Sequence, residues 1–252
     1  MIVAVLASGS RGNATYIKMD GTEILIDFGI ATRRVVEELE RLNTSLDNIQ
    51  AVFITHEHTD HINGLKTFAK RYKTPIYSNS GTMLGIPFYD DVKANWQMFH
   101  GSKKVGKLII TPYSVPHDAL DTVCYTIEGS RKVAVVTDLG YLPNDVRAAI
   151  DGADILTIEA NYDEAMLKAG NYPVKLKRRI MSDTGHLSNT ATGEAIVSLK
   201  KPPKYAILTH LSQENNTPKL ALDTVKQILL DNKVKTTVLL SYPKNCQSIE
   251  MG

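Results

Sequence analysis

One short segment, THEHTDH at residues 55–61, limits what this chain can fold into. It places three histidines and one aspartate within six residues, directly after the apolar run Ala51–Ile54. A short apolar run predicts a buried strand, so the histidines are expected in the loop at its carboxyl end. Side chains at positions i and i+2 of an extended loop point the same way. His56 and His58 can therefore hold one ion.

The same segment continues with Asp60 and His61, where the chain turns into a helix, so these two side chains can face a neighbouring ion. The chain has 7 His but only 2 Cys, so a metal site here uses imidazole and carboxylate rather than thiolate. Such donors suit Zn²⁺, Mn²⁺ or iron. The alternative is a polar loop that is rich in histidine by chance. The density of the pattern at a strand end argues against it.

Other candidate ligands also follow apolar or β-branched runs. They are Asp27, His117, Asp138 and His210. In α/β sheets, functional residues gather at the carboxyl edge of the strands, where the loops converge. Each of these residues alone is more typical of an ordinary polar loop. Together with the histidine-rich segment they provide two sets of three donors and one carboxylate that can bridge them.

Apolar runs and helical patterns alternate along the whole length, which predicts an α/β layered fold. Strands are expected at Ile2–Leu6, Ile24–Ile26, Val52–Ile54, Val133–Val136, Ile155–Ile158, Ala206–Leu208 and Val238–Leu240. Helices are expected after Thr32 as a cap, from Leu65, from Pro143, from Ser188 or Asn189, and from Thr217. No linker or low-complexity tract divides the chain, so residues 1–252 are expected to form a single domain.

The sequence shows no sign of export or of a membrane anchor. Ile2–Leu6 has no basic stretch before it and is too short for a signal peptide, so it is expected to be the first strand. No apolar stretch approaches the ~18 residues of a membrane span. Cys124 and Cys246 lie far apart, which fits a reducing cytoplasm rather than a disulfide framework. Oligomeric state has no signature in the sequence.

Two segments bear on the substrate. Lys plus Arg is 29 and Asp plus Glu is 27, for a net charge of +2, so a basic surface must be a local patch. In the run Lys175–Arg179, Lys177 and Arg178 either contact a nucleic-acid backbone or lie on a solvated helix face. The small polar loop between Ser8 and Asn13 either lines the site through these two residues or forms a tight turn.

The motifs THEHTDH, SVPHD, VVTDLG and LTHLS, in this order, resemble the metallo-β-lactamase superfamily. Three further segments, LASGSRGNATYI, ILIDFG and KRRIMSDTGHLSN, resemble its YycJ/WalJ branch of metal-dependent DNA exonucleases. These motifs run from residue 6 to residue 212, so the resemblance covers most of the chain. It implies a four-layer αβ/βα sandwich with a binuclear metal site along one edge.

The resemblance also implies how the donors divide between two divalent ions, Zn²⁺ or Mn²⁺, with iron as a further choice. The set for one ion is His56, His58 and His117. The set for the second ion is Asp60, His61 and His210, and the residue that bridges the two ions is Asp138. Asp27 matches an aspartate that supports the metal-binding loop, so it is expected to orient ligands rather than to bind metal.

Two ions about 3.5–4 Å apart lower the pKa of a bridging water toward 7, which makes a hydroxide available for attack on a phosphodiester. The leaving oxygen then needs a proton, and two residues compete for this role. Asp60 lies on the ligand loop, whereas His186 lies in the segment SDTGH, where Gly185 lets the backbone bend. His186 alone fits a loop histidine bonded to a carbonyl. The branch resemblance favours a phosphate binder or general acid instead.

The expected function is therefore a binuclear metal-dependent phosphodiesterase, and more narrowly a DNA exonuclease. Glyoxalase II-type thioester or lactone hydrolases share the HxHxDH ligand set and are the alternative. The basic run and the SDTGH loop favour nucleic acid, and DNA in particular, as the partner. A tRNA-processing nuclease is a third interpretation, but no long exosite arm is evident. A non-catalytic binding module would be expected to lack ligands, and all seven positions are filled.

Overall fold

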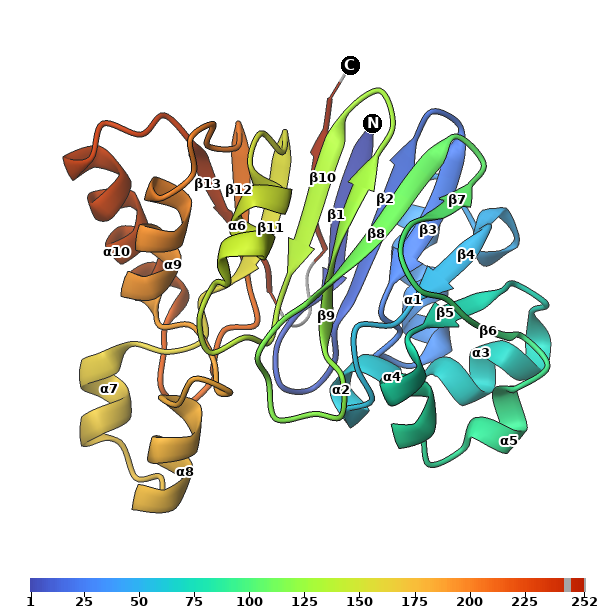
Figure 1. Ribbon diagram of the computed structural model, residues 1–252, viewed down its shortest axis with the longest axis horizontal. Coiled ribbons are helices and arrows are strands. Elements are labelled where there is room, and N and C mark those ends of the chain that lie inside the picture. Colours follow the sequence, from blue (N-terminus) through green and yellow to red (C-terminus); the bar gives the residue numbers. More distant parts are fainter. Residues whose placement is uncertain (243–245, 252) are drawn as a thin grey trace.

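The computed structural model describes residues 1–242 and 246–251, and among these residues a pair of seven-stranded sheets face one another (Figure 1). The first sheet consists, in spatial order, of β14 (Gln247–Glu250), β1 (Ile2–Ala7), β2 (Ala14–Met19), β3 (Thr22–Ile26), β4 (Ala51–Phe53), β5 (Ile76–Ser78) and β6 (Trp96–Met98). The second consists of β13 (Thr237–Leu240), β12 (Tyr205–Thr209), β11 (Ile155–Glu159), β10 (Lys132–Val136), β9 (Val123–Glu128), β8 (Leu108–Ser114) and β7 (Lys103–Val105).

Helices cover the outer faces of both sheets (Figure 1). Those beside the first sheet are α1 (Thr32–Arg41), α3 (Leu65–Arg71), α4 (Ser80–Gly85) and α5 (Tyr89–Val92). Those beside the second sheet are α6 (Asn144–Ile150), α9 (Asn189–Val197) and α10 (Pro218–Asp231). The remaining short helices are η1 (Leu46–Asn48), α2 (Thr59–Ile62), α7 (Glu164–Ala169) and α8 (Val174–Ile180). No helix of the described residues has the length and apolar character needed to cross a bilayer.

Three apolar clusters hold these layers together. One lies between the sheets and joins residues of both, such as Ile24 and Phe53 with Tyr125 and Val133. A second packs the first sheet against α1 and α3, and a third packs the second sheet against α6, α9 and α10. Burial of an apolar face on each side of both sheets produces the four-layer sandwich that the resemblance implies. Its organisation as one domain stays a prediction.

All seven expected strands are present, with their ends shifted by at most two residues. Seven further strands in the described part of the chain are not among those expected from the apolar runs, namely β2, β5, β6, β7, β8, β9 and β14. Among these, β6 and β14 carry exposed positions and interrupted apolar patterns, so periodicity is a weak signal there. Thr32 was wrong as a helix cap, because Ala31 occupies the cap position and the Thr32 hydroxyl donates to the Gly64 carbonyl instead.

Parallel pairing decides where the functional residues gather. Strands β3 to β6 run parallel to one another, and so do β10 to β13. Parallel strands bring their carboxyl ends to a common edge, and the loops that follow them meet there. The short helix α2 lies at this edge, at the lower centre of Figure 1, and α8 lies at the lower left.

Candidate metal centre

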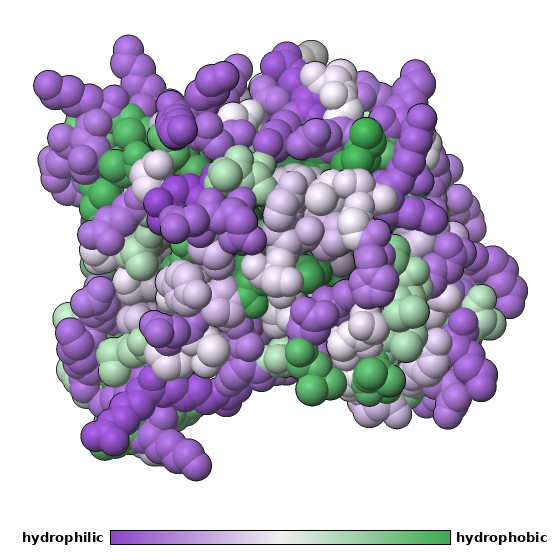
Figure 2. Space-filling model, in the orientation of Figure 1, coloured by the Kyte–Doolittle hydropathy of each residue, from purple (hydrophilic) through white to green (hydrophobic). Residues whose placement is uncertain are grey.

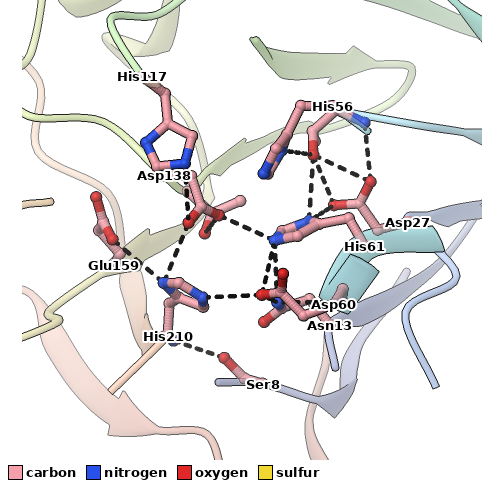
Figure 3. A network of polar contacts seen from close by, with 12 residues as sticks. Ser8, Asn13, Asp27, His56, Asp60, His61, His117, Asp138, Glu159 and His210 are labelled. Carbon is pink, nitrogen blue, oxygen red and sulfur yellow. Dashed lines mark hydrogen bonds and ion pairs between the residues drawn. The ribbon is translucent and has the colours of Figure 1, made fainter. Parts of the chain in front are cut away.

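The predicted ligands converge at the edge where the parallel strands end (Figure 3). Several groups of donors have their ligand atoms within 4.8 Å of one another, and two of these groups correspond to predicted sets. The first group is His56, His58 and His117, and the second is Asp60, His61 and His210. These are the two sets that the resemblance implies. Metal binding by each residue stays a prediction.

Asp138 lies between the two groups. Its Oδ2 is 3.2 Å from His61 Nε2, and its Oδ1 is 3.3 Å from His210 Nδ1. The same Oδ1 is 3.9 Å from Nε2 of His117, which belongs to the other group. The carboxylate is buried, with 2% of the residue exposed. A carboxylate in contact with both groups has the position that a ligand bridging two ions requires.

The ligand loop connects a strand directly to a helix, which explains why four donors follow one another so closely in the chain. His56 and His58 precede α2, and His58 has an extended backbone with φ −61° and ψ 144°. Their rings lie 4.6 Å apart between centroids, so both can face one ion. Asp60 and His61 occupy the first turn of α2, where the chain changes direction and presents them to the second group.

Two glycines let backbone segments approach at the site. A Cβ at Gly29 would lie 1.6 Å from the carbonyl oxygen of Asp60, so the loop after β3 can pack against α2 only with glycine there. A Cβ at Gly185 would lie 2.1 Å from the carbonyl oxygen of Ile180. Glycine is therefore needed at position 185 because the backbone there packs closely against the end of α8. The Gly185 carbonyl in turn lies 3.2 Å from His117 Nδ1 and can orient that ring.

Three site residues have a left-handed backbone, namely Asp27 (φ 61°), Asp138 (φ 57°) and His210 (φ 54°). Each lies just beyond the end of a parallel strand, after β3, β10 and β12 respectively. This conformation costs a non-glycine residue on the order of 1–3 kcal/mol, so it persists only where the surrounding contacts maintain it. Its repetition at three converging strand ends is typical of a functional site rather than of a generic loop.

Asp27 supports the ligand loop through hydrogen bonds to two of its residues. Its Oδ2 is 2.8 Å from His61 Nδ1, and its Oδ1 accepts a hydrogen bond from the Thr55 backbone N–H at 2.8 Å. The Thr55 hydroxyl donates to the same carboxylate and lies 3.0 Å from His56 Nδ1. A carboxylate bonded to Nδ1 leaves Nε2 of His61 available to a metal ion, which is the supporting role expected for Asp27.

Asp27→Asn is expected to weaken the binding of one divalent ion about 10- to 100-fold, because the carboxylate that orients His61 is lost while all seven ligands remain. Asparagine tolerates the positive φ at this position. Titration of the metal-free protein with Mn²⁺ measures the effect. Asp20→Asn is the matched control, since Asp20 also has a positive φ (55°) but lies in the β2–β3 turn. Equal affinities of both variants and wild type would contradict the supporting role.

Ser8 and Asn13 lie beneath the ligands and are 5% and 8% exposed. The Ser8 hydroxyl accepts a hydrogen bond from the His210 backbone N–H at 2.6 Å. The Asn13 side-chain amide donates to Asp60 Oδ2 at 3.0 Å and lies 3.0 Å from His61 Nε2. Both side chains thus hold candidate ligands in place. Their predicted contact with substrate stays a prediction.

The charges around the site favour a cation. Burial by itself lowers the pKa of His210, but Asp138, Asp60 and Glu159 outweigh it and raise that pKa to about 10. Burial likewise opposes the protonation of His61, yet the carboxylates of Asp27, Asp60 and Asp138 raise its pKa well above the ordinary value. Several buried carboxylates converging on these rings attract positive charge, as a proton or as a metal ion.

His56 provides the test of whether the donors fit a metal ion. Burial, followed by the neighbouring His61, holds the pKa of its ring well below the ordinary value, so the imidazole stays neutral. Among the described residues no partner accepts or donates a hydrogen bond at its buried Nε2. A neutral ring with a buried and unpaired nitrogen costs free energy unless a ligand satisfies it. The imidazole and carboxylate donors therefore fit divalent ions.

His186 approaches the same centre from the loop after α8. Its Nδ1 lies 3.0 Å from Glu159 Oε2 and 3.6 Å from Asp138 Oδ1, and 20% of the side chain is exposed. Burial opposes protonation, but Glu159 outweighs it and raises the pKa of His186. The raised pKa favours the protonated form of the ring, which lines a cavity together with the predicted ligands. Its role as a proton donor stays a prediction.

Glu159 is a site residue that the sequence interpretation missed. It is fully buried, and its Oε1 accepts hydrogen bonds from the backbone N–H groups of Leu139 and Leu187 at 2.8 and 3.1 Å. Its Oε2 faces His186 and His210. The signal was available, because Glu159 directly follows the expected strand Ile155–Ile158, as the other candidates follow theirs.

The basic side chains of α8 point in different directions. Lys177 donates to the Lys168 carbonyl at 2.7 Å, and Arg178 is exposed, so neither lies against the ligands. Arg179 instead forms an ion pair with Asp118, next to His117, and lines the metal-site cavity. Figure 2 shows strongly hydrophilic side chains gathered at the lower left, where α8 lies in Figure 1. Substrate contact by Lys177 and Arg178 stays a prediction.

The amino-acid sequence matches known proteins over most of its length. Residues 22–211 match the model of the family described as Beta-lactamase superfamily domain. Exodeoxyribonuclease YycJ of Bacillus anthracis is 34% identical over 232 residues, which cover 90% of this chain and 88% of that protein. Exodeoxyribonuclease WalJ of Streptococcus pneumoniae serotype 2 is 33% identical over 239 residues, which cover 86% of this chain and 84% of that protein.

The fold also matches solved structures. The metallo-beta-lactamase fold protein YhfI of Bacillus subtilis superimposes with a TM-score of 0.72 at 16% identity, over 98% of each chain. An identity this low indicates a common fold alone. The four-layer αβ/βα sandwich that the sequence predicted is thereby confirmed.

Proposed function

The chain belongs to the metallo-β-lactamase superfamily, in the branch of the YycJ and WalJ exodeoxyribonucleases, and from this premise we propose that it is a DNA exonuclease that uses two divalent ions. The family expected from the sequence is confirmed, and the chain is a metal-dependent hydrolase. One observation carries the finer proposal: two groups of three donors with Asp138 in contact with both.

The donor set supports two ions rather than one. His56, His58 and His117 are all imidazoles, whereas the second group includes the carboxylate of Asp60, and Asp138 reaches both. Such donors suit Zn²⁺, Mn²⁺ or iron. Divalent ions held there supply Lewis acidity beside a phosphate group and a water of lowered pKa.

The residues around the ions have distinct tasks in this proposal. Asp60 Oδ2 accepts a hydrogen bond from the Asn13 side-chain amide and lies 3.4 Å from Nε2 of both His61 and His210. These contacts favour the ionised carboxylate, which is the form that binds a metal ion. Burial opposes this ionisation, but the two histidines outweigh it and keep the pKa of Asp60 below its ordinary value. His186 therefore donates the proton to the leaving oxygen in this proposal. Glu159 positions the His186 ring and raises its pKa.

Residues outside the candidate ligand sets bear on the substrate and on the cellular location. Arg179 of α8 lines the metal-site cavity, and Lys177 and Arg178 of the same helix are proposed to attract the DNA backbone of a longer substrate. Ser8 and Asn13 are proposed to act mainly through the ligands they hold. A reducing cytoplasm is proposed as the location, because Cys124 and Cys246 are both free thiols.

A panel of substrates tests the function. Protein loaded with Mn²⁺, and separately with Zn²⁺ or Fe²⁺, is incubated with end-labelled DNA, end-labelled RNA and a glutathione thioester. We expect DNA to be shortened from an end, with mononucleotides as the first products and no hydrolysis after EDTA treatment.

The products discriminate between the proposal and its competitors. Internal fragments at early times would identify an endonuclease, and faster cleavage of RNA would reassign the substrate. Hydrolysis of the thioester without cleavage of DNA would replace the proposal with the glyoxalase II-type activity.

A further inference from the structure

A second cavity opens beside the metal site and shares some of its wall. The metal-site cavity has a volume of about 150 Å³ and includes Ser10, Arg179 and His186 in its lining. The second cavity is larger, about 290 Å³, and the same three residues line it as well. The two spaces therefore meet at these residues, with the candidate ligands on one side only.

The walls of the larger cavity, which we call the side cavity, are of two kinds. Tyr172, Leu176 and Ile180 provide an apolar wall, and all three are partly exposed. Leu176, Arg179 and Ile180 stand at positions i, i+3 and i+4 of α8, so one face of that helix directs them together, and Tyr172 joins the lining from the segment just before the helix. Polar groups of Asn161 and Ser212 lie elsewhere in the lining.

Arg179 stands where the two cavities meet. Its Nε donates to Asp118, whose other oxygen lies 3.4 Å from His117 Nε2. The ion pair fixes the guanidinium beside a predicted ligand, although 59% of the side chain remains exposed. Within residues 1–242 and 246–251 its two terminal nitrogens donate no hydrogen bond to the protein. A guanidinium held at one nitrogen and open at two others is suited to a phosphate group.

From this arrangement we infer that the side cavity receives the terminal nucleotide of the substrate, with Arg179 on its phosphate and Tyr172 against its base or sugar. The inference rests on the proposed function and deepens it. An enzyme that removes nucleotides from an end must accommodate one nucleoside beyond the scissile phosphate. The side cavity adjoins the metal site and combines a cation with an aromatic wall, and these are the two features by which proteins hold single nucleotides.

Binding of a mononucleotide tests the inference without relying on turnover. Thymidine 5′-monophosphate, thymidine and inorganic phosphate are titrated into Mn²⁺-loaded protein by calorimetry. We expect the nucleotide to bind more tightly than either of its parts. Arg179→Ala is expected to weaken binding of the nucleotide and of phosphate about tenfold or more, and to leave thymidine unaffected.

Tyr172→Ala is expected to show the opposite pattern. Binding of the nucleotide and of thymidine falls about tenfold, because a stacking surface is lost, and phosphate binding stays at the wild-type value. Arg33→Ala is the matched control, since Arg33 also pairs with a carboxylate but lies on α1 with Glu37. Its affinities should equal those of wild type. Both side chains to be removed are exposed or partly exposed, so the variants are expected to fold.

The same proteins acting on end-labelled DNA separate this inference from the proposed function. If wild type trims DNA but neither Arg179→Ala nor Tyr172→Ala changes the affinity for the nucleotide, the side-cavity inference alone is overturned. Nucleotide binding that depends on both residues, in a protein that trims no DNA, would overturn the exonuclease proposal and retain the nucleotide site.

Discussion

Replacement of His58 and Asp138 together by alanine is expected to lower DNA hydrolysis about a thousandfold or more. The double variant removes one donor of the imidazole group and the carboxylate in contact with both groups. Neither ion then has its full set of protein ligands. Elemental analysis of the purified variant should show a loss of bound metal that parallels the loss of DNA trimming.

The comparison requires a variant that folds. Asp138 is buried among histidines, whereas His58 is partly exposed, so His58→Ala alone is the second measurement if the double variant is unstable. The control is His100→Ala with Asp47→Ala, which removes a histidine and an aspartate outside the candidate metal groups. Wild-type rates of DNA hydrolysis in a folded His58→Ala, Asp138→Ala variant would show that this centre does not catalyse the reaction.

His186→Ala is expected to lower the turnover of DNA by about 10²- to 10⁴-fold while metal content stays near that of wild type. The reason is that an alkoxide leaving group needs a proton, and the buried carboxylate of Glu159 raises the pKa of His186, which lies outside the two predicted ligand sets. The 4-nitrophenyl ester of thymidine 5′-monophosphate has a leaving group that needs no proton. Hydrolysis of that ester should therefore suffer much less in the same variant.

The ratio of the two rates distinguishes proton donation from other roles. Equal losses on DNA and on the nitrophenyl ester would assign His186 to phosphate binding or to the structure of the loop. A loss of metal would make it a ligand, since its Nδ1 also groups with Asp138, Glu159 and His210. Glu159→Gln is the companion variant. It keeps an acceptor for the backbone N–H groups but removes the charge that raises the His186 pKa, so it should reproduce the leaving-group dependence.

The candidate ligands that the structure brings together share one property: each lies just beyond the end of a strand, in the loop or helical turn that follows it. The segment from His56 to His61 is a strand end followed by a helical turn, so its spacing alone indicates a shared ion. Asp27, Asp138 and His210 each follow an apolar strand, and the parallel order of those strands brings them to one edge. The same reasoning would have found Glu159 at the end of β11.

The basic run on α8 shows where local patterns fail. Composition indicates a cationic segment, but not which cation faces the centre. Arg179 does so because it shares a helical face with Leu176 and Ile180, while Lys177 turns toward α7. The positions of the apolar residues could have predicted that face. The pairing of Arg179 with Asp118 across the site could not be predicted, because 61 residues separate them in the chain.

The sequence by itself determined an α/β layered fold and the candidate ligands, because these depend on hydrophobic periodicity and on short motifs, and the resemblance of those motifs implied the family and the four-layer sandwich. Only the tertiary structure decided how the ligands are supported. Ser8 holds the backbone of His210 across 202 positions, and Asp60 meets His210 across 150. Such contacts form only when both sheets have packed and their strand ends lie side by side. A buried carboxylate such as Glu159 then raises the pKa of a histidine that, as an isolated loop residue, would titrate near its ordinary value.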